Sequence, residues 1–233
     1  DPAPVWLPGG QAQTVWPALF SRSHDTAEPI VYRRERHTTP DADFIDIDWL
    51  VDPVGQGAGL LVLFHGLEGS SRSHYALAFA DWARRHGWRF AVPHFRGCSG
   101  ELNLAPRAYH SGDYAEIGWM LDRIRASQGG GVGPVVAVGV SLGGNALLRW
   151  LGESGHGADI VAAACAVSAP LDLARGGESL SSGINMLYTR MFLQTLKPKC
   201  LAKLERFPGL FDRDALLAAR ERRPTVHSRD RPA

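Results

Sequence analysis

The chain has 233 residues, 45% of them hydrophobic, which is enough for one α/β domain with a core on both faces of its sheet. Its 25 basic and 24 acidic residues give a net charge of +1, which argues against nucleic acid or an anionic membrane surface as a partner. The cysteines, Cys98, Cys165 and Cys200, are widely spaced and form no C-x-x-C pair. This usage fits a reducing compartment, so we expect a cytoplasmic protein.

The sequence shows neither the pattern of a membrane-spanning helix nor that of a secretory leader. No stretch reaches the roughly 20 apolar residues that a membrane-spanning helix needs, so we predict no transmembrane segment. The N-terminal residues contain no basic stretch followed by an apolar core, which is the pattern of a secretory leader. The sequence leaves the oligomeric state open.

The first elements that we predict are two strands, over residues 30–37 and 44–51. The second strand alternates large apolar side chains with Asp46 and Asp48, a pattern typical of a half-buried strand. We expect the two strands to pair as an antiparallel edge of the sheet. The Arg-Arg-Glu-Arg run at 33–36 is interpreted as a solvated strand face rather than a binding patch.

From residue 59 onward, predicted strands alternate with predicted helices, which is typical of parallel βαβ units. The helix after the first of these strands places Tyr75, Phe79 and Trp82 at positions i, i+4 and i+7 and ends at Gly87. Residues 171–219 are expected to be helical, without a further strand. The four predicted parallel strands cover residues 59–64, 88–92, 135–138 and 160–167.

Ser141 is the centre of the sequence Gly-Val-Ser-Leu-Gly at 139–143, which follows the strand at 135–138 and precedes a helix-forming stretch at 145–151. A strand, a sharp turn and a helix form the setting in which a G-x-S-x-G sequence holds a nucleophilic serine exposed. A serine hydroxyl is a weak nucleophile unless a base and amide donors surround it. We therefore predict that Ser141 is the catalytic nucleophile.

A dinucleotide-binding loop is the structural alternative for this segment. Gly139 and Gly144 occupy the first and third glycine positions of a G-x-G-x-x-G sequence, with Ser141 in place of the second. A serine at the second position crowds the approach of a pyrophosphate to the backbone. The next predicted strand is followed by Ser168 rather than by the acidic residue that would bind a ribose, so we favour the nucleophile.

The turn at 65–69, His-Gly-Leu-Glu-Gly, follows the first parallel strand and is the place where an oxyanion hole is expected. In an α/β-hydrolase one donor is the amide of the residue after the nucleophile, here Leu142, and the other comes from this earlier loop. We predict the backbone amides of Leu67 and Leu142 as the two donors. His65 is interpreted as a residue that shapes the loop rather than as the base, because the expected chain order is serine, acid, histidine.

Several motifs that occur in order along the chain resemble the YheT-like branch of the α/β-hydrolase superfamily, also called AB hydrolase superfamily family 4. The resemblance implies an α/β-hydrolase fold, with a mostly parallel central sheet, flanking helices and a helical cap. It also implies a serine hydrolase that acts on carboxylic esters, with Ser141 matching the nucleophile of the family. The segments that carry the resemblance are 6–10, 13–14, 16–17, 65–69, 94–100, 109–113, 140–145, 168–173 and 188–190, with the match extending to about residue 219.

The sequence departs from the family pattern at its end. Family members continue through two more core strands whose loops supply the catalytic acid and then the catalytic histidine, and neither is visible here. Residues 220–233 instead contain five arginines and two prolines. We therefore interpret 1–219 as a hydrolase domain without its last core strands, with a helical cap at about 171–219, and 220–233 as a disordered tail.

Two residues of this chain are candidates for the missing catalytic acid and histidine. Asp172 follows the predicted strand 160–167 and is either the catalytic acid or a helix cap, while His227 is either the base or a residue of the tail. His94 and His110 are expected near the rim of the site, in contacts that shape loops.

The reaction expected from these features is ester hydrolysis through an acyl-Ser141 intermediate, with a small-molecule ester of apolar acyl chain as substrate. We expect no cofactor and no metal, because the sequence contains no H-E-x-x-H and no close pairing of His and Cys. Two alternatives remain. One is a hydrolase-fold protein that lacks the acid and the base, and the other is an acyltransferase.

Overall fold

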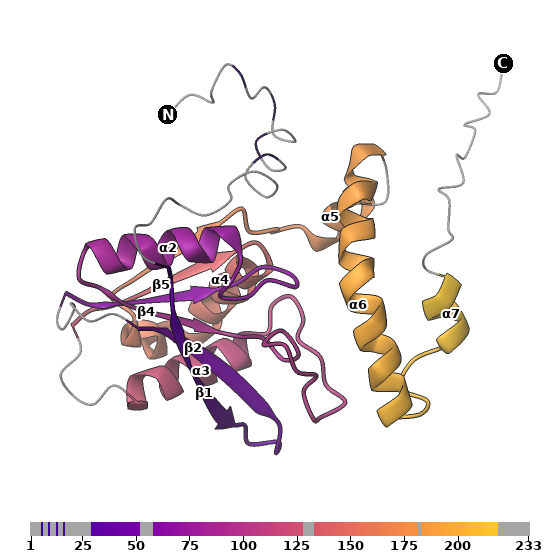
Figure 1. Cartoon of the computed structure of the whole chain (residues 1–233), viewed down its shortest axis with the longest axis horizontal. Coiled ribbons are helices and arrows are strands. Elements are labelled where there is room, and N and C mark those ends of the chain that lie inside the picture. The colour runs from indigo at the N-terminus through magenta and orange to yellow at the C-terminus, as the bar shows by residue number, and fades with distance from the viewer. Residues whose placement is uncertain are drawn as a thin grey trace.

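In a computed structural model of the chain, six strands form one sheet between two layers of helices (Figure 1). The structure describes residues 6, 9, 13, 16, 29–51, 58–127, 133–180 and 183–218.

The strand order in the sheet is β1-β2-β4-β3-β5-β6. β1 pairs antiparallel with β2, β2 pairs antiparallel with β4, and the other neighbouring strands are parallel. The predicted antiparallel edge and the parallel units are therefore confirmed. The strands are β1 (Tyr32–Thr38), β2 (Phe44–Leu50), β3 (Leu60–Phe64), β4 (Arg89–Pro93), β5 (Val135–Val140) and β6 (Ala163–Val167).

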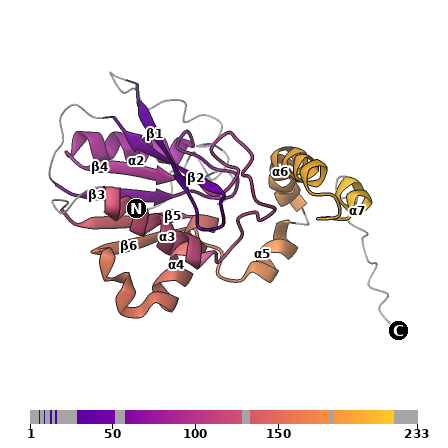
Figure 2. The same ribbon diagram turned by 90° about the horizontal axis from the view of Figure 1, so that it is seen from below.

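Helices cover both faces of the sheet, with α2 on one side and α3 and α4 on the other (Figure 2). The sequence of β3 is a continuous apolar run because the strand is covered by helices on both faces. Leu60, Val62 and Phe64 pack with α3 and α4, whereas Leu61 and Leu63 pack with α2. The helices are α2 (His74–Arg85), α3 (Tyr114–Ser127), α4 (Leu142–Ser154), α5 (Leu173–Leu180), α6 (Met186–Arg206) and α7 (Arg213–Ala218), with short 3₁₀ turns η2 (Gly155–Ile160) and η3 (Gly183–Asn185).

The prediction that β2 is half-buried is wrong. Asp46 and Asp48 are 1% and 3% exposed, so β2 is buried on both faces. On the adjacent β1, Arg36 donates two hydrogen bonds to the Asp46 carboxylate, and Arg34 donates two to that of Asp48. Because each buried charge meets a guanidinium of matching geometry, acidic residues can occupy the covered face.

The aromatic stripe predicted for α2 is confirmed only in part, because Tyr75 and Phe79 pack against the core whereas Trp82 is 40% exposed. The fully buried small residues of the helix are Ala76, Ala80 and Ala83. Small side chains let α2 lie close to the sheet. A strand predicted over 160–167 is shorter in the structure, because residues 155–160 form η2.

The segment from residue 171 is helical in its described part, as predicted, and α5, α6 and α7 lie beside the sheet rather than over one of its faces (Figures 1 and 2). No helix in the described ranges has both the length and the apolar character that crossing a membrane requires. Residues 220–233 and His227 lie outside the described residues.

Candidate active site

Ser141 occupies a sharp turn between β5 and α4. Its backbone has φ 53° and ψ −118°, outside the helical and extended regions that most residues adopt. The Ser141 N–H donates to the carbonyl of Val167 on β6 at 2.8 Å, and the Ser141 carbonyl accepts from Asn145 N–H on α4 at 3.0 Å. The strained residue is therefore held from both sides, as the predicted nucleophile turn requires.

The glycines around Ser141 allow this turn to pack against its neighbours. A Cβ at Gly143 would lie 2.4 Å from the carbonyl oxygen of Phe64, and a Cβ at Gly139 would lie 2.6 Å from that of Gly143. A Cβ at Gly66 would lie 3.2 Å from the Cβ of Ser141. The close approach that these glycines permit brings the turn after β3 directly beside Ser141.

In the turn after β3, the Leu67 amide has no partner among the described residues. Gly69 N–H donates to the Gly66 carbonyl at 2.9 Å, Gly66 N–H donates to the hydroxyl of Tyr75 at 3.0 Å, and Glu68 N–H donates to the hydroxyl of Tyr109 at 2.9 Å. The Leu67 N–H makes no hydrogen bond to any residue that the structure describes. This is the amide that the sequence predicted as an oxyanion donor.

The second predicted donor, Leu142, is the first residue of α4 and is buried. Amides in the first turn of a helix have no partner within the helix, and the helix dipole makes this end attractive to negative charge. The Leu142 N–H therefore lies in a position suited to a developing oxyanion next to Ser141.

His65 is fully buried and both of its ring nitrogens are used by the backbone. Nδ1–H donates to the carbonyl of Gly66 at 2.8 Å, and Nε2 accepts from the N–H of Phe95 at 3.1 Å. Burial lowers the pKa of His65 to about 3. A neutral imidazole with both nitrogens occupied shapes the loop, as predicted, and has no nitrogen free for proton transfer.

His94 belongs to a buried cluster that joins β2 to the loop before α2. This cluster was not predicted from the sequence. His94 Nε2 lies 2.9 Å from Asp48 Oδ2, and the same oxygen accepts from Ser71 Oγ at 2.6 Å. Burial alone would raise the pKa of Asp48, but hydrogen bonds from Arg34, His94 and Ser71 outweigh it and lower the pKa below its usual range. The partners are far apart in sequence, so no local pattern could reveal them.

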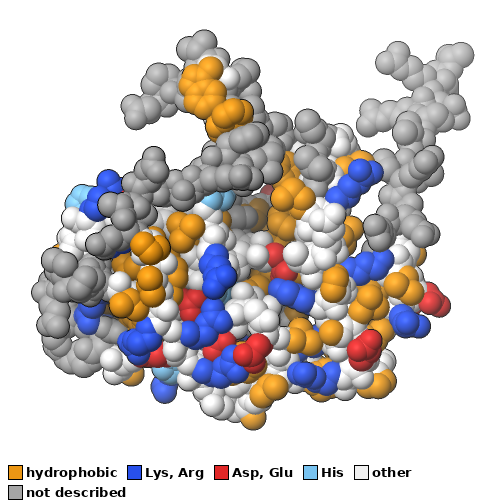
Figure 3. All heavy atoms as spheres, viewed as in Figure 1, with side chains coloured by type: hydrophobic (Ala, Val, Ile, Leu, Met, Phe, Trp, Pro, Cys, Tyr) orange, Lys and Arg blue, Asp and Glu red, His pale blue; other side chains and the backbone are white. Residues whose placement is uncertain are grey.

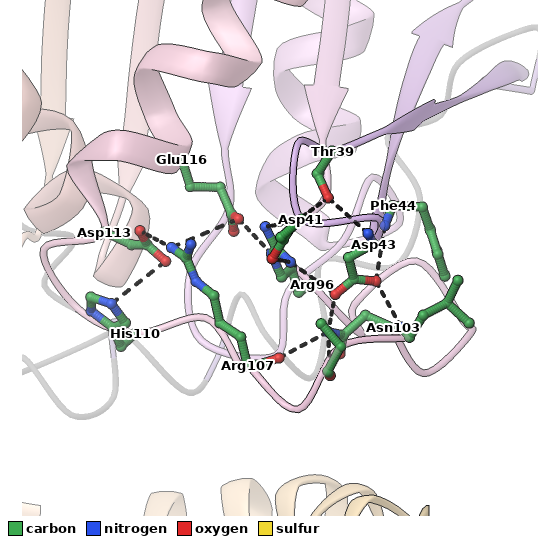
Figure 4. A network of polar contacts seen from close by, with 12 residues as sticks. Thr39, Asp41, Asp43, Phe44, Arg96, Asn103, Arg107, His110, Asp113 and Glu116 are labelled. Atoms are coloured by element: carbon green, nitrogen blue, oxygen red, sulfur yellow. Dashed lines mark hydrogen bonds and ion pairs between the residues drawn. The ribbon is translucent and has the colours of Figure 1, made fainter.

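A second buried network surrounds Arg96 in the loop after β4 (Figure 4). The Arg96 guanidinium donates to Glu116 at 2.6 Å, to Asp41 at 2.7 Å and to Asp43 at 2.8 Å. Asn103 also donates to Asp43, at 2.5 Å. The network ties the β1–β2 turn and the N-terminal end of α3 to the loop after β4, which carries His94.

No catalytic base contacts Ser141 in the described part of the chain. The Ser141 hydroxyl has no hydrogen-bond partner there. Asp172 caps α5, because its Oδ1 accepts from Arg175 N–H at 3.0 Å, so the helix-cap alternative is the one observed. His110 is exposed and lies 3.7 Å from Asp113, while His227 lies outside the described residues.

The helices beyond residue 171 enclose a cavity of about 710 Å³ between α6 and α7. Its lining includes Leu193, Leu201 and Leu217 with Arg190 and Lys197, but none of Ser141, Leu67 and Leu142. We therefore assign this cavity no part in the chemistry at Ser141.

Fold and site together define the class of the protein. A mostly parallel sheet carries a strained serine between strand and helix, with an unpaired amide beside it, and residues 59–223 match the alpha/beta hydrolase fold family. The chain belongs to this family. The match decides against a dinucleotide-binding loop at 139–144.

Within the family the chain is YheT-like. It is 40% identical over 200 residues to the putative esterase YheT of Escherichia coli K12, covering 82% of this chain and 58% of that protein. It is also 29% identical to human phospholipase ABHD3, over 82% of this chain and 46% of that protein. The chain thus spans about half the length of these curated relatives.

Solved structures agree on the fold. The esterase Pf2001 of Pyrococcus furiosus superposes with a TM-score of 0.54 at 17% identity, covering 73% of this chain and 63% of that one. At this identity the likeness concerns the fold alone.

Proposed function

We propose that the protein hydrolyses carboxylic esters through an acyl-Ser141 intermediate. The observation that carries the proposal is the unpaired Leu67 amide beside the strained Ser141, with the first amide of α4 on the adjoining residue. Two amide donors next to a serine hydroxyl form the arrangement that stabilises the oxyanion of acyl transfer. The printed names of the relatives, a putative esterase and a phospholipase, support the same reaction class.

In the proposed reaction Ser141 Oγ attacks the acyl carbon and loses its proton to a histidine base. The Leu67 and Leu142 amides bind the oxyanion, the ester C–O bond breaks, and the alcohol leaves with the proton. Water then attacks the acyl-serine and releases the carboxylic acid and the free hydroxyl. No described histidine hydrogen-bonds Ser141, and His227 stays a prediction for the base.

The substrate proposed is a small-molecule ester with an apolar acyl chain. We infer that residues 1–219 act as one hydrolase domain and that the helical segment at about 171–219 forms a cap. Met186 and Phe192 on α6 would supply apolar surface for an acyl chain. No cofactor or metal enters the proposed reaction.

A fluorophosphonate probe tests whether Ser141 is activated. We expect the folded protein to be labelled once, at Ser141, and the Ser141→Ala variant to remain unlabelled. Absence of labelling in a protein that melts cooperatively would contradict the proposal.

The second candidate is a hydrolase-fold protein without a complete triad in these residues, favoured by the Ser141 hydroxyl that has no described partner. In that case labelling would be slow and turnover close to the residual level of an oxyanion hole alone. If labelling is fast, adding a competing alcohol or thiol separates hydrolysis from acyl transfer, since only a transferase converts most of the acyl group into a new ester or thioester.

A further inference from the structure

Glu68 stands in a backbone conformation that ordinarily belongs to glycine. Its φ is +56°, and it is the third residue of the turn that the Gly69 N–H to Gly66 carbonyl bond closes. Turns with a positive φ at this position favour glycine or asparagine. A glutamate here costs conformational energy, which the contacts of its side chain can offset.

Those contacts form a small cluster around the carboxylate, which is 7% exposed. Glu68 Oε1 accepts from the hydroxyl of Tyr109 at 2.8 Å, and the same hydroxyl accepts from Glu68 N–H at 2.9 Å. Glu68 Oε2 lies 2.7 Å from Nζ of Lys199. Tyr109 thus holds the backbone and the side chain of Glu68 together, and Lys199 neutralises the buried charge.

Lys199 reaches this turn from α6, far along the chain and outside the α/β layers. α6 has other anchors to the same region, since Lys203 Nζ donates to the carbonyls of Asn103 and Ala105, and Arg206 donates to the Asn103 carbonyl at 3.2 Å. We therefore expect the helix to remain docked without Lys199. What Lys199 adds is a charged contact directly to the residue that follows Leu67.

We infer that Lys199 is a positioning residue for the oxyanion hole. Through the Glu68 carboxylate it holds the turn in the conformation that leaves the Leu67 amide without a described partner, next to Gly66, which lies against Ser141. Helix α6 thereby helps to hold the oxyanion turn in place. This inference rests on the proposed function, because the Leu67 amide matters only if an acyl group reacts at Ser141.

The test compares Lys199→Met with Lys197→Met. Methionine keeps the aliphatic stem and removes the charge in both variants, but Lys197 bonds the carbonyl of Leu217 on α7 and has no contact with the turn. We expect Lys199→Met to slow fluorophosphonate labelling of Ser141 and ester kcat at least tenfold, with KM changed less than threefold. Lys197→Met should stay within twofold of the unmodified protein.

A double-mutant cycle with Glu68→Gln shows whether the pair acts as a unit. If it does, Glu68→Gln combined with Lys199→Met reacts no more slowly than the slower single variant. Losses that multiply, or a Lys199→Met variant as reactive as Lys197→Met, would overturn the inference.

Hydrogen exchange separates failure of this inference from failure of the proposed function. Peptides covering residues 65–70 should take up deuterium faster in Lys199→Met than in Lys197→Met, whether or not the protein turns over an ester. Equal uptake in the two variants would overturn the inference, even with an active enzyme. An unmodified protein that the probe fails to label would contradict the proposed function, while the exchange comparison would still decide whether Lys199 holds the turn.

Discussion

Most of the described non-glycine residues with a positive φ lie close to Ser141 in the fold. Four described non-glycine residues have a positive φ, and three of them, Glu68, Ser141 and Ser168, lie in the site or directly after the strand that anchors it. Val167, the residue before Ser168, accepts the hydrogen bond from Ser141 N–H. Strained residues persist where the surrounding structure holds them and where the conformation serves a function.

His65 gives a prediction for the dependence of stability on pH. Its pKa is about 3 in the fold and about 6.5 in an unfolded chain, because burial disfavours the charged ring. The contribution of His65 is therefore fully present above pH 6.5 and is lost as the pH falls toward 3, by up to about 1.4 kcal/mol per pH unit. We expect the free energy of unfolding, measured with urea, to fall across this range.

The matched control is His65→Gln, which has no proton to gain. Glu116, whose pKa burial raises, acts in the opposite direction but is present in both proteins. The difference in unfolding free energy between the two proteins should therefore shrink from pH 6.5 to pH 4.5. A difference that stays constant over that interval would show that His65 is not held neutral.

Ion pairs between residues far apart in the sequence join the loops at the ends of the strands. Arg96 is the centre of the network in Figure 4, and its side chain is 4% exposed. The hydrogen bond from Arg96 lowers the pKa of Asp41 to about 2, while Asp43 and Glu116 are buried beside it. Removing the guanidinium would leave buried carboxylates without a cation.

We therefore expect Arg96→Met to lower the free energy of unfolding by about 3–5 kcal/mol, because an uncompensated buried charge is strongly destabilising. Arg33→Met is the control, since Arg33 is 63% exposed and pairs with a partly exposed Glu35. That change should cost at most about 1 kcal/mol. Equal losses in urea unfolding would contradict the importance of the network.

Sequence patterns predicted the features of the site that are local in the chain. The turn at Ser141 and the turn at Leu67 each lie within five consecutive residues, between elements with clear periodicity. The clusters of Glu68 with Lys199 and of Asp48 with His94 were missed because their partners meet only in the folded chain. The burial of β2 was missed for the same reason, because the buried charges of Asp46 and Asp48 are neutralised by arginines of the neighbouring strand.

The whole molecule presents no single-sign electrostatic surface on the face shown in Figure 3, where acidic and basic side chains lie interspersed. This agrees with the net charge of +1.

Trapping the acyl-enzyme shows whether Ser141 carries the covalent intermediate. The folded protein is mixed with p-nitrophenyl butyrate, quenched in acid within seconds, digested and analysed by mass spectrometry. We predict a butyryl group on the peptide that contains Ser141, and none in the Ser141→Ala variant. A protein that releases p-nitrophenol at the same rate with and without the Ser141 hydroxyl, and that never carries the acyl group on this peptide, would contradict the account.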